Sequence, residues 1–203
     1  VTSALRSWRD IQTIEQSRRG LRRVLDASRV LFASRTGHGF AADVLDELLG
    51  LTAAAVGEPS TGGLAGVAAR PRNDEAVVVA GRGALAATVG SPLRELLATR
   101  ESRAVERILD GEACHFHDHG FAAGIRDEAS PGLLFLVRSA VPLQRVDRGL
   151  VEIFLSNASL SYHNANLSRE IIDTQKEIIH TLGEVVETRS KETANHVLRV
   201  GKM

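Results

Sequence analysis

The longest regular pattern of apolar and polar positions lies near the end of the chain, between Leu167 and Val200. Apolar residues occur there as doublets, and one series of positions alternates spacings of three and four residues, as coiled-coil core positions do. The segment has no proline and one glycine, so it predicts one long amphipathic helix. The positions of the stripe are Ile171, Ile172, Gln175, Ile178, Ile179, Leu182, Val185 and Val186.

An isolated helix does not bury an apolar stripe of this width, so the stripe requires a partner. One interpretation is that the helix packs on its own domain. The other, which we favour, is a parallel contact with the same helix of a second copy, giving a homodimer. In that interpretation the dimer seam consists of Ile172, Ile179, Leu182 and Val186.

The rest of the chain switches between helical and strand-like patterns. Turn-rich segments are predicted at 57–63 and 71–74. Helices are predicted over Val1 to Phe32, over His38 to Leu51 and from Val146 onward. One or two short helices are predicted over Pro92 to Asp110, with the apolar set Leu93, Leu96, Leu97, Val105 and Leu109. Strands are predicted over Leu64 to Arg70, Ala76 to Ala80, Ala113 to Ala122 and Leu133 to Val141.

This order of segregated helices and strands predicts an α+β fold, in which helices pack on one side of a sheet. The segment from Leu133 to Val141 is nearly continuous in apolar residues, which is typical of a central strand.

Composition limits the functions that remain. The chain has 203 residues, 43% of them hydrophobic, which suffices for one domain with helices extending beyond it. Its 25 basic and 25 acidic residues give no net charge, so no general field attracts nucleic acid or a membrane surface. The paired arginines at 18–19 and 22–23 are interpreted as a solvated helix face rather than a nucleic-acid patch.

Targeting and redox signals point to the cytoplasm. The only cysteine is Cys114, so no intrachain disulfide forms. No apolar run approaches the roughly 20 residues of a membrane helix, and the first residues lack the apolar core of a signal peptide. The first residue is Val1 rather than methionine, from which we expect a piece of a longer protein.

Three histidines alternate through the sequence CHFHDHG. On one strand His115, His117 and His119 share a face, where they could hold a metal ion or small anion or respond to pH. The alternative is an ordinary solvated strand face. Cys114 and Phe116 are then expected to point to the opposite face, into the core.

A second candidate pair lies at the end of the long helix. Glu192 and His196 are four residues apart, so they share a helix face and could bind one metal ion. On spacing alone such a pair is more typical of a solvated helix surface.

The surrounding string, TQKEIIHTLGEVVETRSKETANHVLRV, closely resembles the opening of HD-GYP domains, the metal-dependent phosphodiesterases that cleave cyclic di-GMP. An E-T-x-x-H-x-x-R helix opens the catalytic domain in that family, and its Glu and His help to hold iron or other divalent metals. The resemblance implies these roles for Glu192 and His196. A hydrolytic site needs at least three protein ligands, so two ligands at the chain end imply a connector to an enzyme absent here.

The order of elements resembles a GAF-type sensory domain. The resemblance implies an antiparallel sheet flanked by helices, with long N- and C-terminal helices that extend as signalling (coiled-coil) helices. The phrase VEIFLSNASLSYHNANL resembles the region that joins such sensors to HD-GYP domains, and ALRSWRDIQTIEQSRRGLRRVL resembles the linker after a receiver domain. The resulting organisation is an N-terminal signalling helix (1–30), a GAF-like domain (31–155), a coiled-coil linker (156–190) and the start of an HD-GYP domain (191–203).

The leading hypothesis is a non-enzymatic sensory, dimerisation and relay module of a cytoplasmic bacterial response regulator. Its partners would be a second copy and the receiver and HD-GYP domains of the same chain, without nucleic acid or membrane. No cofactor is expected in this chain, whereas the HD-GYP domain would hold the metals. One alternative is a metal-dependent phosphohydrolase built from Glu192, His196 and the histidine strand. Another is a small-ligand receptor with its cavity between the sheet and residues 92–110.

Overall fold

The computed structural model describes residues 39–56, 63–72, 75–127, 130–144 and 146–200. Of residues 127, 130, 131 and 190–200 it describes the backbone alone. The chain divides into an N-terminal unit, Val1–His163, and a C-terminal unit, Asn164–Met203. The predicted helix over residues 1–32 and most of the predicted turn at 57–63 lie outside the described residues.

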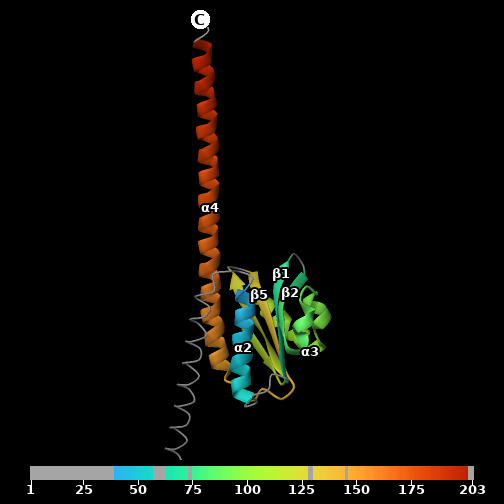
Figure 1. Ribbon diagram of the computed structural model, residues 1–203. Coiled ribbons are helices and arrows are strands. Elements are labelled where there is room, and N and C mark those ends of the chain that lie inside the picture. The colour runs from blue at the N-terminus through green and yellow to red at the C-terminus, as the bar shows by residue number, and fades with distance from the viewer. Residues whose placement is uncertain (1–38, 57–62, 73–74, 128–129, 145, 201–203) are drawn as a thin grey trace, which may run out of the picture. The chain divides into compact units, whose positions relative to one another are not determined.

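The N-terminal unit contains a five-stranded antiparallel sheet with strand order β2-β1-β5-β4-β3 (Figure 1). This confirms the predicted combination of helices and antiparallel strands. In chain order the elements are α2 (Phe40–Val56), β1 (Leu64–Arg72), β2 (Glu75–Arg82), the 3₁₀ helices η2 (Gly83–Thr88) and η3 (Leu93–Leu96), α3 (Thr99–Leu109), β3 (Cys114–His117), β4 (Gly120–Asp127), β5 (Ser130–Ser139) and α4 (Arg148–Val200).

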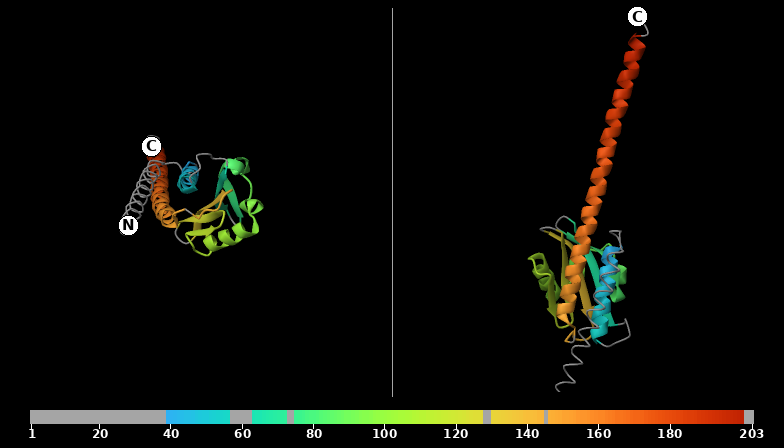
Figure 2. Two further views of the ribbon diagram at one scale, coloured as in Figure 1. Left: turned by 90° about the horizontal axis from the view of Figure 1, so that it is seen from below. Right: turned by 90° about the vertical axis from the view of Figure 1, so that its left-hand side faces the viewer.

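Strand β5 lies at the centre of the sheet, between β1 and β4. Phe135 and Val137 belong to the core cluster that contains α2 and α4, whereas Leu134 and Leu136 belong to the cluster that contains α3. The central position predicted for this strand is confirmed. The prediction of helices on one side is wrong, because both faces are covered (Figure 2). Burial on both faces is why the strand is apolar at successive positions.

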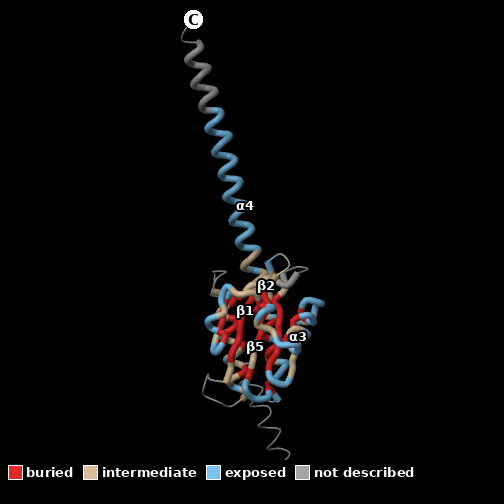
Figure 3. The backbone as a smooth tube through the Cα atoms, turned by 90° about the vertical axis from the view of Figure 1, so that its right-hand side faces the viewer, coloured by how far each residue is buried: buried red, intermediate tan, exposed pale blue. Residues whose placement is uncertain are grey.

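The first turns of α4 and helix α2 form the core on one face of the sheet. Because α4 packs through one stripe, its residues differ sharply in exposure: Phe154 and Ala158 are fully buried, whereas Ile153 is 46% and Leu160 55% exposed. In Figure 3 the buried residues gather in the strands, and exposed residues lie around them. The buried apolar members of α4 are Val151, Phe154, Leu155 and Ala158.

Helix α3 and the two 3₁₀ helices cover the other face. The prediction of one or two short helices over residues 92–110 agrees with η3 and α3, but its apolar set needs one correction. Leu109 is 48% exposed, whereas Ile108 is buried. Because α3 buries positions three and four residues apart from Glu101 onward, residue 108 faces the sheet and residue 109 does not.

The predicted strand from Ala113 to Ala122 is wrong, because two strands occupy this segment. His117 pairs with Gly120, so β3 and β4 form a hairpin around Asp118 and His119. The turn is fixed to the following loop: Ser139 N donates to His119 O at 2.7 Å, and Leu143 N to Asp118 O at 2.8 Å. The alternating pattern persists through the turn, which hides the hairpin in the sequence.

Helix α4 has 53 residues and confirms the predicted long C-terminal helix. In the C-terminal unit its large apolar side chains between residues 167 and 186 are 43–69% exposed. They are Leu167, Ile171, Ile172, Ile178, Ile179, Leu182, Val185 and Val186. Among the described residues, no helix is both long and apolar enough to span a membrane.

Candidate functional site

A group of half-buried and buried polar side chains lies on the face of the sheet that α3 covers. His117 on β3 pairs with Gly120 on β4, which pairs with Arg138 on β5. Directly paired positions project to the same face, so His117 and Arg138 share the face that α3 covers with Glu101. This group consists of His117, Arg138 and Glu101.

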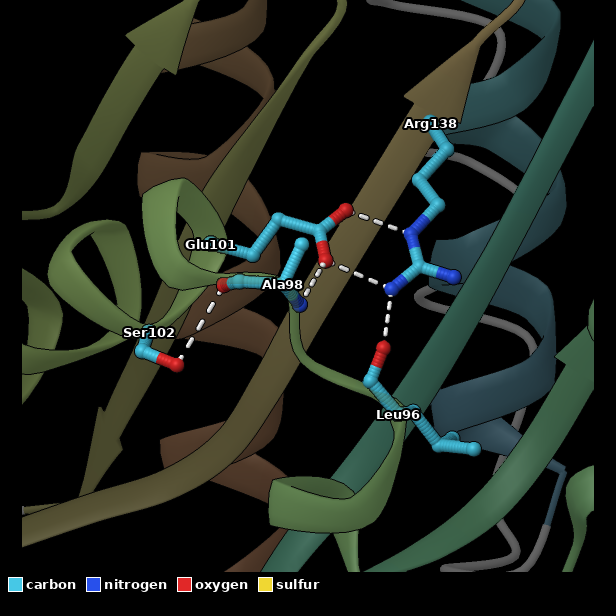
Figure 4. A network of polar contacts seen from close by, with 5 residues as sticks. All are labelled: Leu96, Ala98, Glu101, Ser102 and Arg138. Atoms are coloured by element: carbon cyan, nitrogen blue, oxygen red, sulfur yellow. Dashed lines mark hydrogen bonds and ion pairs between the residues drawn. The ribbon is translucent and has the colours of Figure 1, made fainter.

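Glu101 and Arg138 form a two-pronged ion pair (Figure 4). Arg138 Nη2 donates to Glu101 Oε2 at 2.5 Å, and its Nε donates to Glu101 Oε1. The Glu101 side chain is 7% exposed and that of Arg138 31%. The pair is therefore largely removed from water, where such a geometry is strong.

Two backbone groups complete this network. Arg138 Nη2 also donates to the carbonyl oxygen of Leu96, at the end of η3. Glu101 Oε2 accepts a hydrogen bond from Ala98 N at 2.7 Å, which satisfies a free N–H at the start of α3. One arginine on the central strand thus fixes both the end of η3 and the beginning of α3.

The charge state of Glu101 follows from these contacts. Burial raises the pKa of this carboxyl, but the hydrogen bonds from Arg138 and Ala98 outweigh burial and hold the pKa below its ordinary value. Glu101 is therefore an ionised structural anchor at neutral pH. A general acid at that pH would require the opposite shift.

His117 lies half-buried beside this pair. Among the residues that the structure describes, its Nε2 atom is buried without a hydrogen-bond partner. A Cβ atom at Gly120 would come within 2.2 Å of Val137 O and within 3.1 Å of this Nε2, so the position requires glycine beside both the β5 backbone and the ring. Burial lowers the pKa of His117, and the charges of Glu101 and Asp118 oppose that shift. The ring is therefore neutral at pH 7.

We expect His117 to make the protein less stable as the solution is acidified from pH 7 to pH 5. Its pKa is lower in the folded chain than the ordinary 6.5, so below that pH the unfolded chain binds more protons and is stabilised relative to the folded chain. Replacing His117 with glutamine should remove this contribution, so that the variant loses less free energy of unfolding between pH 7 and pH 5 than the unchanged protein does. Urea unfolding at pH 7, 6 and 5 measures it. The matched control is His119→Gln, since His119 is exposed; equal slopes for both variants and the unchanged protein would contradict the expectation.

The structure separates the three histidines. His115 and His117 share a strand face, but β3 ends at His117, so His119 lies in the turn and is exposed. His115 Nδ1 lies 2.9 Å from Glu112 Oε2. Within the described ranges, no group of three or more His, Cys, Asp or Glu residues is placed to hold a metal ion. The candidate metal site was predicted on one strand face shared by all three histidines. His119 does not lie on that face.

Glu192 and His196 lie on helical backbone within α4, so their four-residue spacing places them on one face of that helix. Their side chains lie outside the described residues. The spacing fits two ligands of one metal ion, as the resemblance to HD-GYP domains implies, and their metal role stays a prediction.

Cys114 and Phe116 point to the opposite face of β3, as predicted, and pack against the core cluster of α2 and α4. Phe116 stacks on Phe121 at 4.9 Å between ring centroids, and the Arg148 guanidinium lies 5.0 Å from its ring centroid. Burial raises the pKa of Cys114 to about 12, so the reactive thiolate is scarce at neutral pH. Cys114 thus acts as a packing residue on this face of β3.

The predicted ligand cavity between the sheet and residues 92–110 is occupied by apolar side chains, among them Leu93, Val105 and Ile108. Elsewhere, a hollow of about 30 Å³ is lined by Ala53, Val56 and residues at the ends of β1 and β5. Small-molecule sites measure about 300–1,000 Å³, so this hollow has room for water only.

Sequence analysis missed the Glu101–Arg138 pair. A signal was present, because an arginine within the apolar run of a central strand needs a buried partner. Its partner lies 37 residues away in the sequence, so no local pattern identified it.

One similar solved structure confirms the fold. The chain is similar to the chromophore-binding domain of a bacteriophytochrome from R. palustris, with a TM-score of 0.54 at 10% sequence identity. The similarity covers 73% of this chain and 62% of that one, so the chain spans less than two thirds of that structure. This similarity confirms the predicted α+β, GAF-like fold class.

A second similar structure is the GAF domain of a phosphoenolpyruvate-protein phosphotransferase from Acinetobacter, with a TM-score of 0.42 and 17% identity. The similarity covers 73% of this chain and 95% of that domain. No curated protein matches the chain. The family described as a domain of unknown function (DUF3369) matches residues 1–171, which is more than half of the chain, and the chain therefore belongs to this family.

Proposed function

We propose that this chain is the sensory, dimerisation and relay module of a cytoplasmic bacterial response regulator. In this proposal the module lies between an N-terminal receiver and a C-terminal HD-GYP phosphodiesterase. It performs no chemistry itself. It changes how two copies of α4 pack against each other, and α4 carries that change to the helix that bears Glu192 and His196.

The observation that carries this proposal is the difference in burial along α4. At one end Phe154 is fully buried in the core of the N-terminal unit. Farther along the same helix, Ile179 is 69% and Leu182 58% exposed. A helix that exposes so many large apolar side chains at regular spacing is typical of an interaction surface. Its first turns meanwhile tie it to the sheet.

Two further observations support a relay that runs from the sensory unit to an HD-GYP domain. The fold is GAF-like, and the residues after Thr174 resemble the opening of an HD-GYP domain. A helix that is continuous from Arg148 to Val200 can connect the two. Switching then requires two packings of the helix pair that are close in free energy, with the sensory unit favouring one of them.

Replacing Ile179 and Leu182 together with glutamate is expected to convert the dimer into a monomer. Each dimer would lose four apolar side chains from the interface and gain four charges close together, so we expect the dissociation constant to rise by at least about 100-fold. Light scattering coupled to size-exclusion chromatography of the whole chain measures this change.

The matched control changes two charges on the opposite side of the same helical turns. Glu177 and His180 are exposed there, and Glu177→Lys with His180→Glu should leave the dimer intact. If the unchanged protein is a monomer, or the Ile179 and Leu182 variant remains dimeric, the proposed function is wrong in its central step.

A further inference from the structure

A line of apolar residues on α4 begins before the C-terminal unit does. An α-helix completes five turns in 18 residues, so residues 18 positions apart lie above one another. Ile153 therefore lines up with Ile171, Leu160 with Ile178, and Leu167 with Val185. Together with Leu182 these residues fall within about 60° of the helix circumference. We call Ile153, Leu160, Leu167, Ile171, Ile178, Leu182 and Val185 the apolar line.

Every member of the apolar line is exposed, by 43–58%. In the N-terminal unit the line lies away from the core, since Ile153 and Leu160 are exposed where Phe154 and Ala158 are fully buried. One helix therefore has two apolar faces in the same turns: one binds the sheet and the other is uncovered among the described residues.

Between Ile153 and Val185 the charges of α4 avoid this line. Five of the six charged residues in this stretch lie on the other side of the helix and Glu170 lies at the flank; the five are Arg169, Asp173, Lys176, Glu177 and Glu184. Thr181 lies beside the line, and its hydroxyl donates to Glu177 O at 2.9 Å, so it brings no unsatisfied donor into a contact. The line is thus suited to burial along its full length.

We infer that the apolar line is the contact of α4 with α4 of a second copy, parallel and in register, and that it begins at Ile153 within the sensory unit. This inference rests on the proposed dimer and names its partner surface. The predicted seam at Ile172, Ile179 and Val186 then forms one flank of the contact, and Leu182 belongs to both.

Length and area favour a second copy as the occupant. The line spans 33 residues, or roughly 50 Å of helix. Among the described helices only α4 matches it, because α2 has 17 residues and α3 has 11. Seven half-exposed aliphatic side chains offer on the order of 100 Å² each, roughly 700 Å² per copy. A standard interface buries about 800 Å² per partner, and the flanking seam residues supply the remainder.

The position of Asn164 favours the parallel orientation. It is exposed and lies on the edge of the apolar line. In a parallel pair in register it meets its own counterpart, an arrangement by which a single asparagine fixes the register of a helix pair. In an antiparallel pair it would meet Thr174 instead.

Single cysteines test this inference directly. In a Cys114→Ala background of the whole chain, Leu160→Cys and Ile178→Cys are treated with a short bis-maleimide. Both are expected to form covalent dimers in most of the protein. Glu152→Cys and Glu177→Cys are the controls, because they are exposed in the neighbouring turns off the apolar line, and they should link at least about tenfold more slowly. Light scattering of each untreated variant reports whether it dimerises.

The outcomes separate this inference from the proposed function. A dimer that links in the Ile178→Cys variant but not in the Leu160→Cys variant keeps the proposed function and overturns the inference, since another segment then covers Leu160. If the Leu160→Cys variant links only after it is mixed with the Ile178→Cys variant, the pair is antiparallel, which also overturns the inference. A monomeric Cys114→Ala protein, with the unchanged protein also monomeric, removes both.

Discussion

Replacing Phe154 with alanine is expected to lower the free energy of unfolding by about 3–5 kcal/mol. The Phe154 ring extends from the first turns of α4 and is fully buried in the core that α4 forms with helix α2 and the sheet. Its removal exposes no polar group but leaves a cavity, because the surrounding β-strands are fixed by their hydrogen bonds and fill the space only in part. Urea unfolding of the whole chain, followed by circular dichroism at one protein concentration, measures the loss.

Two variants test whether the loss of stability comes from the lost volume of the Phe154 side chain and from its burial. Phe154→Leu keeps most of the volume and should lose clearly less stability than the alanine variant. Glu152→Ala lies in the same turn but is exposed, so it should stay within about 0.5 kcal/mol of the unchanged protein. A loss below about 1 kcal/mol for Phe154→Ala would mean that the first turns of α4 are not seated on the sheet, and the relay would lose its anchor.

Much of this fold could be predicted because its elements carry strong periodic signals. The continuous apolar run of β5 identified the central strand, and the three-and-four spacing after Leu167 identified the long helix. Both signals arise from burial or exposure of whole faces, which a sequence displays directly.

What escaped prediction depends on partners that are distant in sequence or on turns that preserve the pattern. The β3–β4 hairpin turns at Asp118 and His119, where the alternation of polar and apolar residues continues, so the two strands appeared as one. Helices on both faces of the sheet follow from tertiary packing. The same applies to the candidate site, because Glu101 and Arg138 meet only when α3 covers β5.

The apolar face of α4 illustrates a subtler limit. A heptad description selects Ile172, Ile179, Leu182 and Val186, and it treats the helix as supercoiled. Burial of Phe154 and exposure of Ile153 in the same turns show which side is covered within the N-terminal unit. That knowledge extends the uncovered stripe back to Ile153, a conclusion that spacing alone did not give.

Replacing Arg138 with methionine is expected to lower the free energy of unfolding by about 2–4 kcal/mol. Methionine retains the apolar stem, so the main effect is the loss of charge and hydrogen bonds. Glu101, with its side chain 7% exposed, would be left as an uncompensated carboxylate, and Leu96 O would lose its donor. Because the pair normally holds the pKa of Glu101 low, its contribution is fully present above the ordinary carboxyl pKa and is lost progressively as pH falls from there through the lower pKa of the folded chain. Urea unfolding at pH 7 and pH 4 should therefore show a smaller difference between variant and unchanged protein at pH 4.

The matched control is Arg82→Met. Arg82 also donates two hydrogen bonds to a carboxylate, from Nε to Asp46 Oδ1 at 2.6 Å and from Nη2 to Asp46 Oδ2 at 2.8 Å. The side chains of Arg82 and Asp46 are, however, 40% and 51% exposed. Water screens this pair, so its loss should change stability by no more than about 1 kcal/mol. The double variant Glu101→Gln with Arg138→Met removes the stranded charge, and should be more stable than the sum of the single losses implies. Equal effects at Arg138 and Arg82 would show that burial gives the Glu101 pair no special role, and that α3 is held to the sheet by apolar contacts alone.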